Sequence, residues 1–238
     1  TRAGVAWVDY STGAHLALGV MFALYRRLAT GKGGQAVEVA LMDIAVGCVA
    51  GLAVAAEYKV GGFLRGRQGN HSYYSITDCH QAKDGYVMIS VSGKPIWRRF
   101  ARAIGREEWR DDPRFETDKI RYDNREIIQT VVKKWVSERT VAEVVQRMEE
   151  FRVPCSEVYD IAQMVEDPHL KARETLIDLE YPRIGKVPVP GVIIKMSETP
   201  GQVFRPAPEP GEYNEEVYGA LLGLKPDDLA QLKAEGII

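Results

Sequence analysis

Cysteine is scarce in this chain, and the few residues present do not form a recognisable pair. The 238 residues include three cysteines, Cys48, Cys79 and Cys155, which are far apart and odd in number. There is no C-x-x-C pair, and Cys79 directly precedes His80, a spacing that is poor for joint metal ligation. We therefore expect reduced thiols in a cytoplasmic protein, with neither a disulfide framework nor a metal site.

The chain also lacks an excess of either charge and an uninterrupted apolar run. Lys and Arg number 31 against 33 Asp and Glu, a net charge of −2, and the basic residues are scattered. Nothing therefore favours nucleic acid as a partner. The longest apolar stretch, 41–58, contains Asp43 and Glu57, so it predicts one buried helix of a soluble core and no membrane span. The first residues lack the pattern of a signal peptide.

What is present, above all, is an apolar helix near the start of the chain. Asp9 is followed by the cap-type residues Ser11 and Thr12 and then by about five turns of mostly apolar residues. The apolar residues lie nearly all round the helix, which predicts that it is buried. Two arginines at 26–27 suit the last turn, and Gly31 is placed to end the helix.

Asp9 has two interpretations at the start of this helix. By residue type alone it is more often a helix cap. Alternatively, it is a carboxylate held ionised at a helix N-terminus and used as a nucleophile. His15, on the following turns, is more often a hydrogen-bonded core histidine than a substrate contact. Position alone leaves both questions open.

The pattern after this helix predicts an α/β fold. Residues 36–40 alternate with β-branched side chains and predict a strand, and 41–58 predict a second helix. A helix that is apolar on all faces needs partners to cover it. We expect these to come from another chain, another copy or a preceding segment.

The pattern of residues 63–189 predicts a smaller α+β domain. A glycine-rich, basic stretch at 61–70 predicts a linker. A phosphate cradle is the weaker alternative, because the stretch lacks both the G-x-G-x-x-G and the Walker spacing. Strands at 73–77 and 86–91 predict a hairpin. Helices are expected at 95–104, 124–138, 141–151, 161–165 and 168–174, and a further strand at 176–181.

The end of the chain is expected to return to the first domain. The prolines of 182–190 predict a stiff linker, followed by a strand at 192–195, an extended stretch at 206–210 and a helix pair at 214–222 and 226–235. The expected division is 1–62 for part of a large domain, 63–189 for the small α+β domain and 190–238 for the return.

Several motifs in this order resemble the class III CoA-transferases. The stretch D-Y-S-T-G-A-H-x-A-L-G from Asp9 is followed by R-Q-G-N-H at 67–71, A-K-D-G-Y-V at 82–87 and D-P-R-F at 112–115. V-P-C-S-E-V at 153–158 and E-D-P-H-L-K-A-R-E at 166–174 complete the series. Each motif is moderately specific, and their shared order is highly specific.

The resemblance implies a fold, a reaction and a nucleophile. It implies a Rossmann-like large domain, of which part is present, joined to the small domain in an interlocked homodimer. The aspartate that matches Asp9 attacks an acyl-CoA in this family and forms first an anhydride and then an aspartyl-CoA thioester. CoA and acyl-CoA are thus substrates, with a carboxylic acid as acceptor and no permanent cofactor. Gly69, Asn70, His71 and His15 are the expected substrate contacts.

Departures from the family pattern separate its branches. Formyl-CoA:oxalate transferases carry four glycines after the G-N pair, whereas this chain has His71-Ser72-Tyr73-Tyr74, which argues against oxalate as the acceptor. The related 2-methylacyl-CoA racemases have a glutamate where this chain has Lys94, which argues against racemisation. Family members also carry a nucleotide-binding segment before the aspartate. A non-catalytic subunit or fragment that needs a separate N-terminal half is therefore the third hypothesis.

Overall fold

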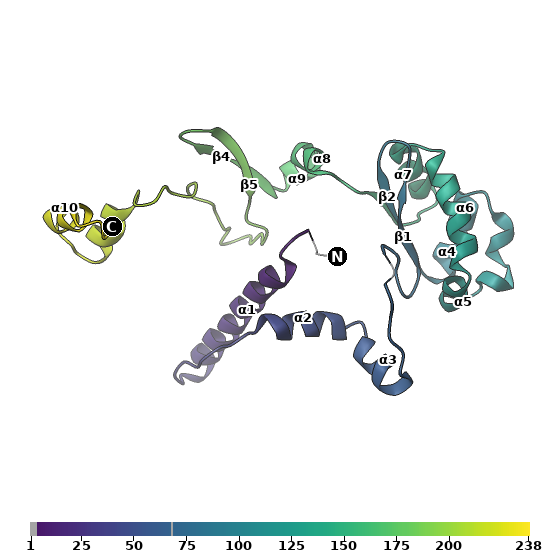
Figure 1. Ribbon diagram of the computed structural model, residues 1–238, viewed down its shortest axis with the longest axis horizontal. Coiled ribbons are helices and arrows are strands. Elements are labelled where there is room, and N and C mark those ends of the chain that lie inside the picture. The colour runs from purple at the N-terminus through teal and green to yellow at the C-terminus, as the bar shows by residue number, and fades with distance from the viewer. Residues whose placement is uncertain (1–3, 68) are drawn as a thin grey trace. The chain divides into compact units, whose positions relative to one another are not determined.

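The computed structural model describes residues 4–67 and 69–238, which fall into two compact units that divide after Gly69. The first unit is helical, and the second contains all the strands of the described chain (Figure 1). The finer division expected at residues 62 and 189 stays a prediction.

The first unit begins with α1 (Trp7–Thr30), which confirms the expected long helix. Gly31 ends it in the left-handed conformation, and its N–H donates to the Arg27 carbonyl at 3.0 Å. At the other end the N-cap is Ala6, which provides no side-chain hydrogen bond. The interpretation of Asp9 as the helix cap is therefore wrong, because the helix begins two residues before it.

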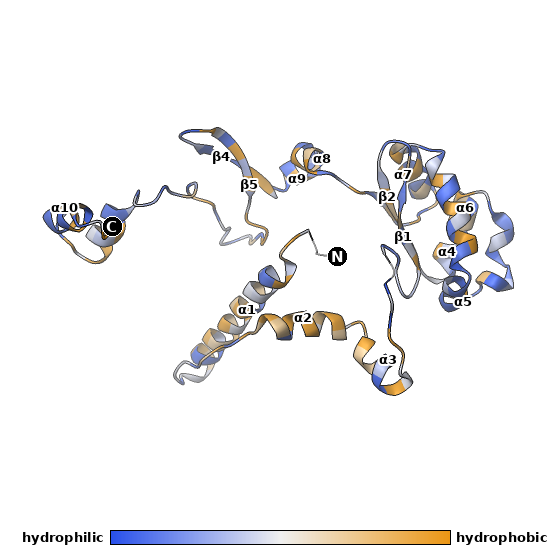
Figure 2. Ribbon diagram, in the orientation of Figure 1, coloured by the Kyte–Doolittle hydropathy of each residue, from blue (hydrophilic) through white to orange (hydrophobic). Residues whose placement is uncertain are grey.

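The apolar side chains of this unit are exposed rather than buried. Neither α1 nor the next two helices, α2 (Leu41–Ala50) and α3 (Val54–Gly61), contains a buried residue. Figure 2 shows α2 hydrophobic along most of its length. The expected burial of these helices is wrong for the described chain, because α1 and α2 contact each other but most of their apolar side chains stay exposed.

The segments expected as a strand and a single helix also differ. Residues 36–40 form no ladder, since a strand needs a neighbour to pair with, yet Val37 and Val39 are half-buried while their neighbours are exposed, a period of two. The helix predicted over 41–58 breaks between α2 and α3 with a bend of 65°. Gly51 has a low helix propensity and Ala53 takes a left-handed φ of 60°, which together interrupt the helix.

The second unit begins with a three-stranded antiparallel sheet in the order β1-β2-β3. Its strands are β1 (Ile76–Gln81), β2 (Tyr86–Val91) and β3 (Cys155–Glu157). The hairpin is confirmed, but its first strand starts later than the expected 73–77, because the Ser72 N–H donates to the Thr77 carbonyl and closes residues 72–77 into a loop. β3 was not expected.

Helices cover one face of this sheet, so the α+β prediction is confirmed for residues 70–158. The α4 (Gly93–Ala103), α6 (Arg125–Ser137) and α7 (Val141–Glu150) helices match expectation, and a capping box at Thr140 starts α7. Two short 3₁₀ turns, η1 (Glu107–Arg110) and η2 (Pro113–Phe115), and α5 (Asp118–Asp123) were missed. The core between sheet and helices includes Val87, Ile89, Val91, Trp97, Phe100, Phe115, Ile128, Val132, Val136, Val144 and Met148.

The stretch expected as a proline-stiffened linker is a strand. After α8 (Ile161–Glu166) and α9 (Pro168–Ala172), β4 (Leu176–Tyr181) pairs with β5 (Gly185–Pro190). The Gly191 N–H donates to the Thr175 carbonyl at 2.9 Å, which makes odd-numbered β5 residues the hydrogen-bonded ones. Pro188 and Pro190 fall between them, where a missing N–H costs nothing.

The end of the chain contains the expected helix pair. It consists of η3 (Glu215–Leu221), a π-helix, and α10 (Pro226–Ala234). The expected strand at 192–195 is wrong, since these residues pair with no other strand in the described chain. Among the described residues no single helix is both long and apolar enough to cross a membrane, although the bent pair α2–α3 meets that test together by length and composition.

Candidate functional site

Asp9 lies in the first turn of α1, at the end of the helix that carries partial positive charge. The first intrahelical hydrogen bond joins the Tyr10 N–H to the Ala6 carbonyl, so the N–H groups of residues 7–9 have no acceptor within the helix. The Asp9 side chain is exposed, and no described residue donates a hydrogen bond to it. An exposed carboxylate without a hydrogen-bond donor among the described residues therefore lies in the uncapped first turn of α1.

His15, the other candidate on α1, is fixed by its own helix. Its Nδ1 lies 2.7 Å from the Ser11 carbonyl, which can only accept, so Nδ1 carries a proton. The side chain is exposed rather than in a core, which corrects the expected core histidine. His15 lies six positions after Asp9 on the helix, about 9 Å along the axis and about a third of a turn around it. The two side chains therefore emerge from different faces of α1.

The remaining candidates are three consecutive residues. Gly69 is the last residue of the first unit, and Asn70 and His71 begin the second. Gly69 has a φ of +65°, a left-handed conformation that favours glycine, and Asn70 is exposed. Gln68, part of the same motif, lies outside the described residues. His71 is half-buried, and its Nδ1 lies 3.2 Å from Oδ2 of Asp78.

A set of hydrogen bonds holds the loop between His71 and Asp78 in shape. The Ser72 N–H donates to the Thr77 carbonyl at 2.9 Å. Inside the loop the hydroxyls of Ser75 and Thr77 lie 2.8 Å apart, and that of Thr77 lies 3.0 Å from the hydroxyl of Ser90 on β2. His71 therefore stands at the base of an ordered loop.

Asp78 is the polar partner that the sequence reasoning missed. Its residue exposure is 6%, and its Oδ1 accepts the Cys79 N–H at 2.8 Å. Strand alternation places Asp78 and His80 on the same inward face of β1 as Ile76. An acid on the inward face of a strand needs a partner, so the I-T-D-C-H pattern was the available signal.

His80, two residues further on, is a buried histidine with an unpaired nitrogen. It is 3% exposed, and Nδ1 has no hydrogen-bond partner among the described residues. Burial lowers the pKa of the His80 imidazole below its ordinary value, while the Asp78 carboxylate acts in the opposite direction. The positive charge of Lys133 and the imidazole of His71 add to the lowering.

The basic linker does not offer its first arginine to a phosphate. Arg65 donates from Nε and Nη2 to both carboxylate oxygens of Glu57, each at 2.6 Å, and from Nη2 to the Leu52 carbonyl at 3.1 Å. The hydrogen bond from Arg65 lowers the pKa of Glu57. Arg65 thus anchors the start of the linker to α3, which weakens the phosphate-cradle interpretation.

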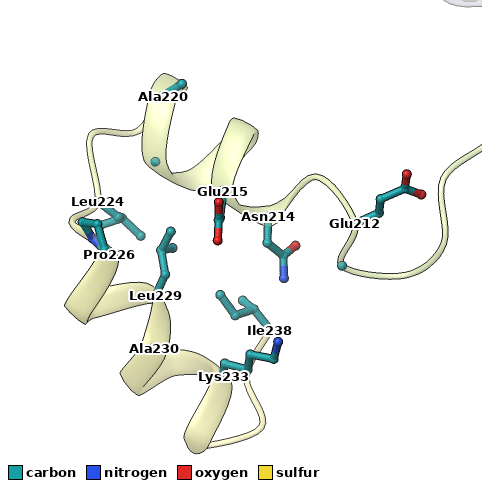
Figure 3. Close-up of a pocket in the computed structure, with 12 residues that line it drawn as sticks. Glu212, Asn214, Glu215, Ala220, Leu224, Pro226, Leu229, Ala230, Lys233 and Ile238 are labelled. Carbon is teal, nitrogen blue, oxygen red and sulfur yellow. The ribbon is translucent and has the colours of Figure 1, made fainter. Parts of the chain in front are cut away.

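Lys94 and a cavity near the end of the chain are two further features of the second unit. Lys94 lies in the first turn of α4, where its ammonium is 3.3 Å from Glu116. A cavity of about 550 Å³ lies between η3 and α10 (Figure 3), with Leu229 and Ile238 extending into it. It contains none of the predicted site residues. Among residues 4–67 and 69–238 no three His, Cys, Asp or Glu side chains gather as metal ligands would.

The chain is similar in sequence to several CoA-transferases. The chain is 30% identical over 240 residues to a succinyl-CoA–D-citramalate CoA-transferase of Chloroflexus aurantiacus, covering 100% of this chain and 59% of the relative. It is also 30% identical to a formyl-CoA:oxalate CoA-transferase of Streptomyces coelicolor, covering 97% of this chain and again 59% of the relative. The chain thus spans less than two thirds of the length of these relatives.

The structure of this chain also resembles solved structures of other proteins. A CAIB/BAIF family protein from Brucella suis is 25% identical with a TM-score of 0.73, over 93% of this chain and 57% of that one. A Mycobacterium tuberculosis protein in an orthorhombic crystal form has a TM-score of 0.72 at 21% identity, over 90% of this chain and 56% of that one. The family model described as CoA-transferase family III matches residues 1–214. The chain therefore belongs to CoA-transferase family III, as its motifs predict.

Proposed function

We propose that this protein transfers coenzyme A between carboxylic acids, with Asp9 as the nucleophile. The observation that carries the proposal is the position of Asp9, which lies in an uncapped first helical turn. The resemblance of the motif D-Y-S-T-G-A-H to the family pattern supports its match to the family's aspartate. The unpaired N–H groups of that turn are hydrogen-bond donors beside the side chain, and a carboxylate is the form that attacks a thioester.

The proposed reaction proceeds by acyl exchange and needs no net proton transfer. The Asp9 carboxylate attacks the donor thioester carbonyl, the C–S bond breaks, and CoA leaves as a thiolate. The thiolate attacks the Asp9 carbonyl of the resulting anhydride and releases the donor acid. The acceptor carboxylate then attacks the aspartyl-CoA thioester, releases the thiolate again, and receives it at its own carbonyl. Free Asp9 is regenerated.

The loop residues Gly69, Asn70 and His71 are proposed as contacts to the acyl-CoA, with His15 as a further candidate. Amide donors are needed wherever an oxyanion develops on a thioester carbonyl. The left-handed φ of Gly69 turns the backbone sharply, and Asn70 is exposed, so both leave backbone and amide groups accessible. The ordered base of the loop gives His71 a defined position.

The acceptor is proposed to be a short dicarboxylic acid that carries a hydroxyl group. Relatives of this chain from Chloroflexus aurantiacus are named for D-citramalate and L-malate as acceptors, with succinyl-CoA as donor. Oxalate is disfavoured because His71-Ser72-Tyr73-Tyr74 replaces the glycines of the oxalate branch. Racemisation is disfavoured because Lys94 offers no carboxylate to move a proton.

We further propose a cytoplasmic homodimer with CoA thioesters as substrates and no resident cofactor. The two L-malate relatives are named as alpha and beta subunits, so assembly from two chains has a counterpart in the family. Light scattering of the intact protein measures its mass in solution, and a monomer would contradict the dimer.

The test of the reaction is a kinetic comparison of Asp9 variants in the intact protein. Succinyl-CoA serves as donor and L-malate, D-citramalate, glutarate and oxalate as acceptors. Asp9→Asn is expected to lower kcat by about a thousandfold or more, since the residue forms the covalent intermediates. Unchanged transfer in this variant would overturn the assignment. No transfer in the wild type would favour the non-catalytic subunit.

A further inference from the structure

His71 and Asp78 form a polar pair at the base of the loop. Nδ1 of His71 lies 3.2 Å from Oδ2 of Asp78, and no described residue pairs with Nε2. An ionised carboxylate only accepts hydrogen bonds, so the proton of a neutral imidazole must be on Nδ1. Nε2 then has a lone pair and no proton. In this form His71 accepts a hydrogen bond there and cannot donate one.

The surroundings of Asp78 hold it in this role. Its side chain is 8% exposed, whereas that of His71 is 30% exposed, so the carboxylate lies inside the domain and the imidazole at its surface. Oδ1 is already occupied by the Cys79 N–H at 2.8 Å, which leaves Oδ2 for His71. The Ser72–Thr77 backbone bond closes the loop beside the pair. The carboxylate is therefore fixed before any ligand binds.

We propose that Asp78 is a positioning residue that fixes the Nδ1–H tautomer of His71, so that Nε2 accepts a hydrogen bond from a hydroxyl group on the acyl acid. This inference rests on the proposed function, in which His71 contacts the acyl group. It assigns a specificity: acids with a hydroxyl near the reacting carboxyl are preferred to the same acids without it. A deoxy acid would leave Nε2 unpaired once water is excluded.

The first arm of the test needs no activity. Long-range ¹H–¹⁵N NMR of the intact protein distinguishes the two tautomers of each neutral imidazole. Four histidines are present, and His71→Gln identifies the signal of His71. The wild type is expected to have Nδ1–H, and Asp78→Ala to show the Nε2–H form. An Nε2–H form in the wild type would overturn the proposal.

The second arm measures specificity. With succinyl-CoA as donor, the ratio of kcat/KM for 2-hydroxyglutarate over glutarate is expected to be about tenfold or more, the effect of one hydrogen bond to an otherwise unpaired group. Asp78→Asn should reduce this ratio toward one, because the asparagine amide can donate to Nδ1 and move the proton to Nε2. In a His71→Gln background the same substitution should change the ratio no further.

A matched control separates this role from general stability. Asp84 is also in the hairpin, and its Oδ1 accepts the Val141 N–H at 2.7 Å without contact to His71. Asp84→Asn should leave both the tautomer and the acid ratio unchanged. A ratio near one in the wild type, or an equal change in Asp84→Asn, would overturn the specificity. Absence of any transfer would refute the proposed function, while the tautomer result would still decide whether Asp78 positions His71.

Discussion

The guanidinium of Arg121 donates to the carboxylate of Asp118 at 2.7 Å, although the arginine side chain is only 1% exposed. The same carboxylate accepts the Gly93 N–H at the start of α4. Arg121 also donates to the Phe115 carbonyl at 2.6 Å and lies over the Trp97 ring, 5.2 Å from its centre. This pair joins α5 to α4 beneath the aromatic core.

Removal of the buried charge should therefore be costly. Arg121→Met leaves the Phe115 carbonyl without its donor and the carboxylate without its cation, so we expect the free energy of unfolding to fall by about 3 kcal/mol. Urea denaturation followed by tryptophan fluorescence measures it. The control is Lys119→Met on the same helix, whose partner Asp123 is exposed, with an expected change below about 0.5 kcal/mol. Equal effects of the two variants would contradict this account.

Two glycines of α1 should respond in opposite directions to alanine. A Cβ at Gly13 would meet nothing within 4 Å, so Gly13→Ala should stabilise the helix by up to about 1 kcal/mol. A Cβ at Gly19 would lie 2.8 Å from a methyl of Val37, and the overpacking outweighs the gain in helix propensity. We expect a net loss of about 1 kcal/mol. Hydrogen exchange of α1 amides measures both, and equal protection in the two variants would contradict the contact.

The outcome for α1 illustrates what the sequence can predict. Its length and its end at Gly31 follow from local rules, as does the capping box of Thr140, because each depends on residues within one or two turns. Strand β5 was missed because its two prolines look like a linker until the register with β4 is known. Local signals cannot supply a register.

The candidate site divides in the same way. Asp9 is proposed from its motif. The strand pattern indicates that Asp78 needs a partner, but it does not identify His71, which is seven residues away around a closed loop. The break between α2 and α3 depends on the left-handed Ala53, a conformation that the residue type does not favour. The exposed faces of α1–α3 depend on whatever covers them, which no local pattern identifies.

His80 should make stability depend on pH. Because burial lowers its pKa, the folded state resists a proton that the unfolded state accepts near pH 6.5. The contribution of His80 is present above pH 6.5 and is lost as the pH falls from there through the lowered value. Denaturation midpoints at pH 8, 7, 6 and 5 test this, with NMR titration of the imidazole. A His80 signal that titrates at or above pH 6.5 would contradict it.

Cys155 should be slow to react although it is only partly covered. Burial raises the pKa of its thiol to about 11, so little thiolate is present at pH 8. Iodoacetamide is expected to label the exposed Cys48 and to leave Cys155 unmodified until urea is added. The folded state should also lose stability as the pH rises from about 9 toward 11, because only the unfolded thiol ionises freely there. Equal labelling of both cysteines in the folded protein would exclude this.

Asp43 provides a close internal control for the proposed role of Asp9. Each is an exposed aspartate in the first turn of a helix whose N-cap makes no side-chain hydrogen bond, and each is the third residue of its helix. If a helix N-terminus alone made a carboxylate reactive toward thioesters, both residues would be modified. The proposed function requires that only Asp9 is modified.

The decisive measurement is mass spectrometry of the intact protein after incubation with succinyl-CoA and hydroxylamine, followed by peptide mapping. We expect a hydroxamate at Asp9, formed from the anhydride or the aspartyl-CoA thioester, with none at Asp43 and none in Asp9→Asn. Absence of modification at Asp9 in a preparation that transfers CoA, or equal modification of Asp43, would contradict it.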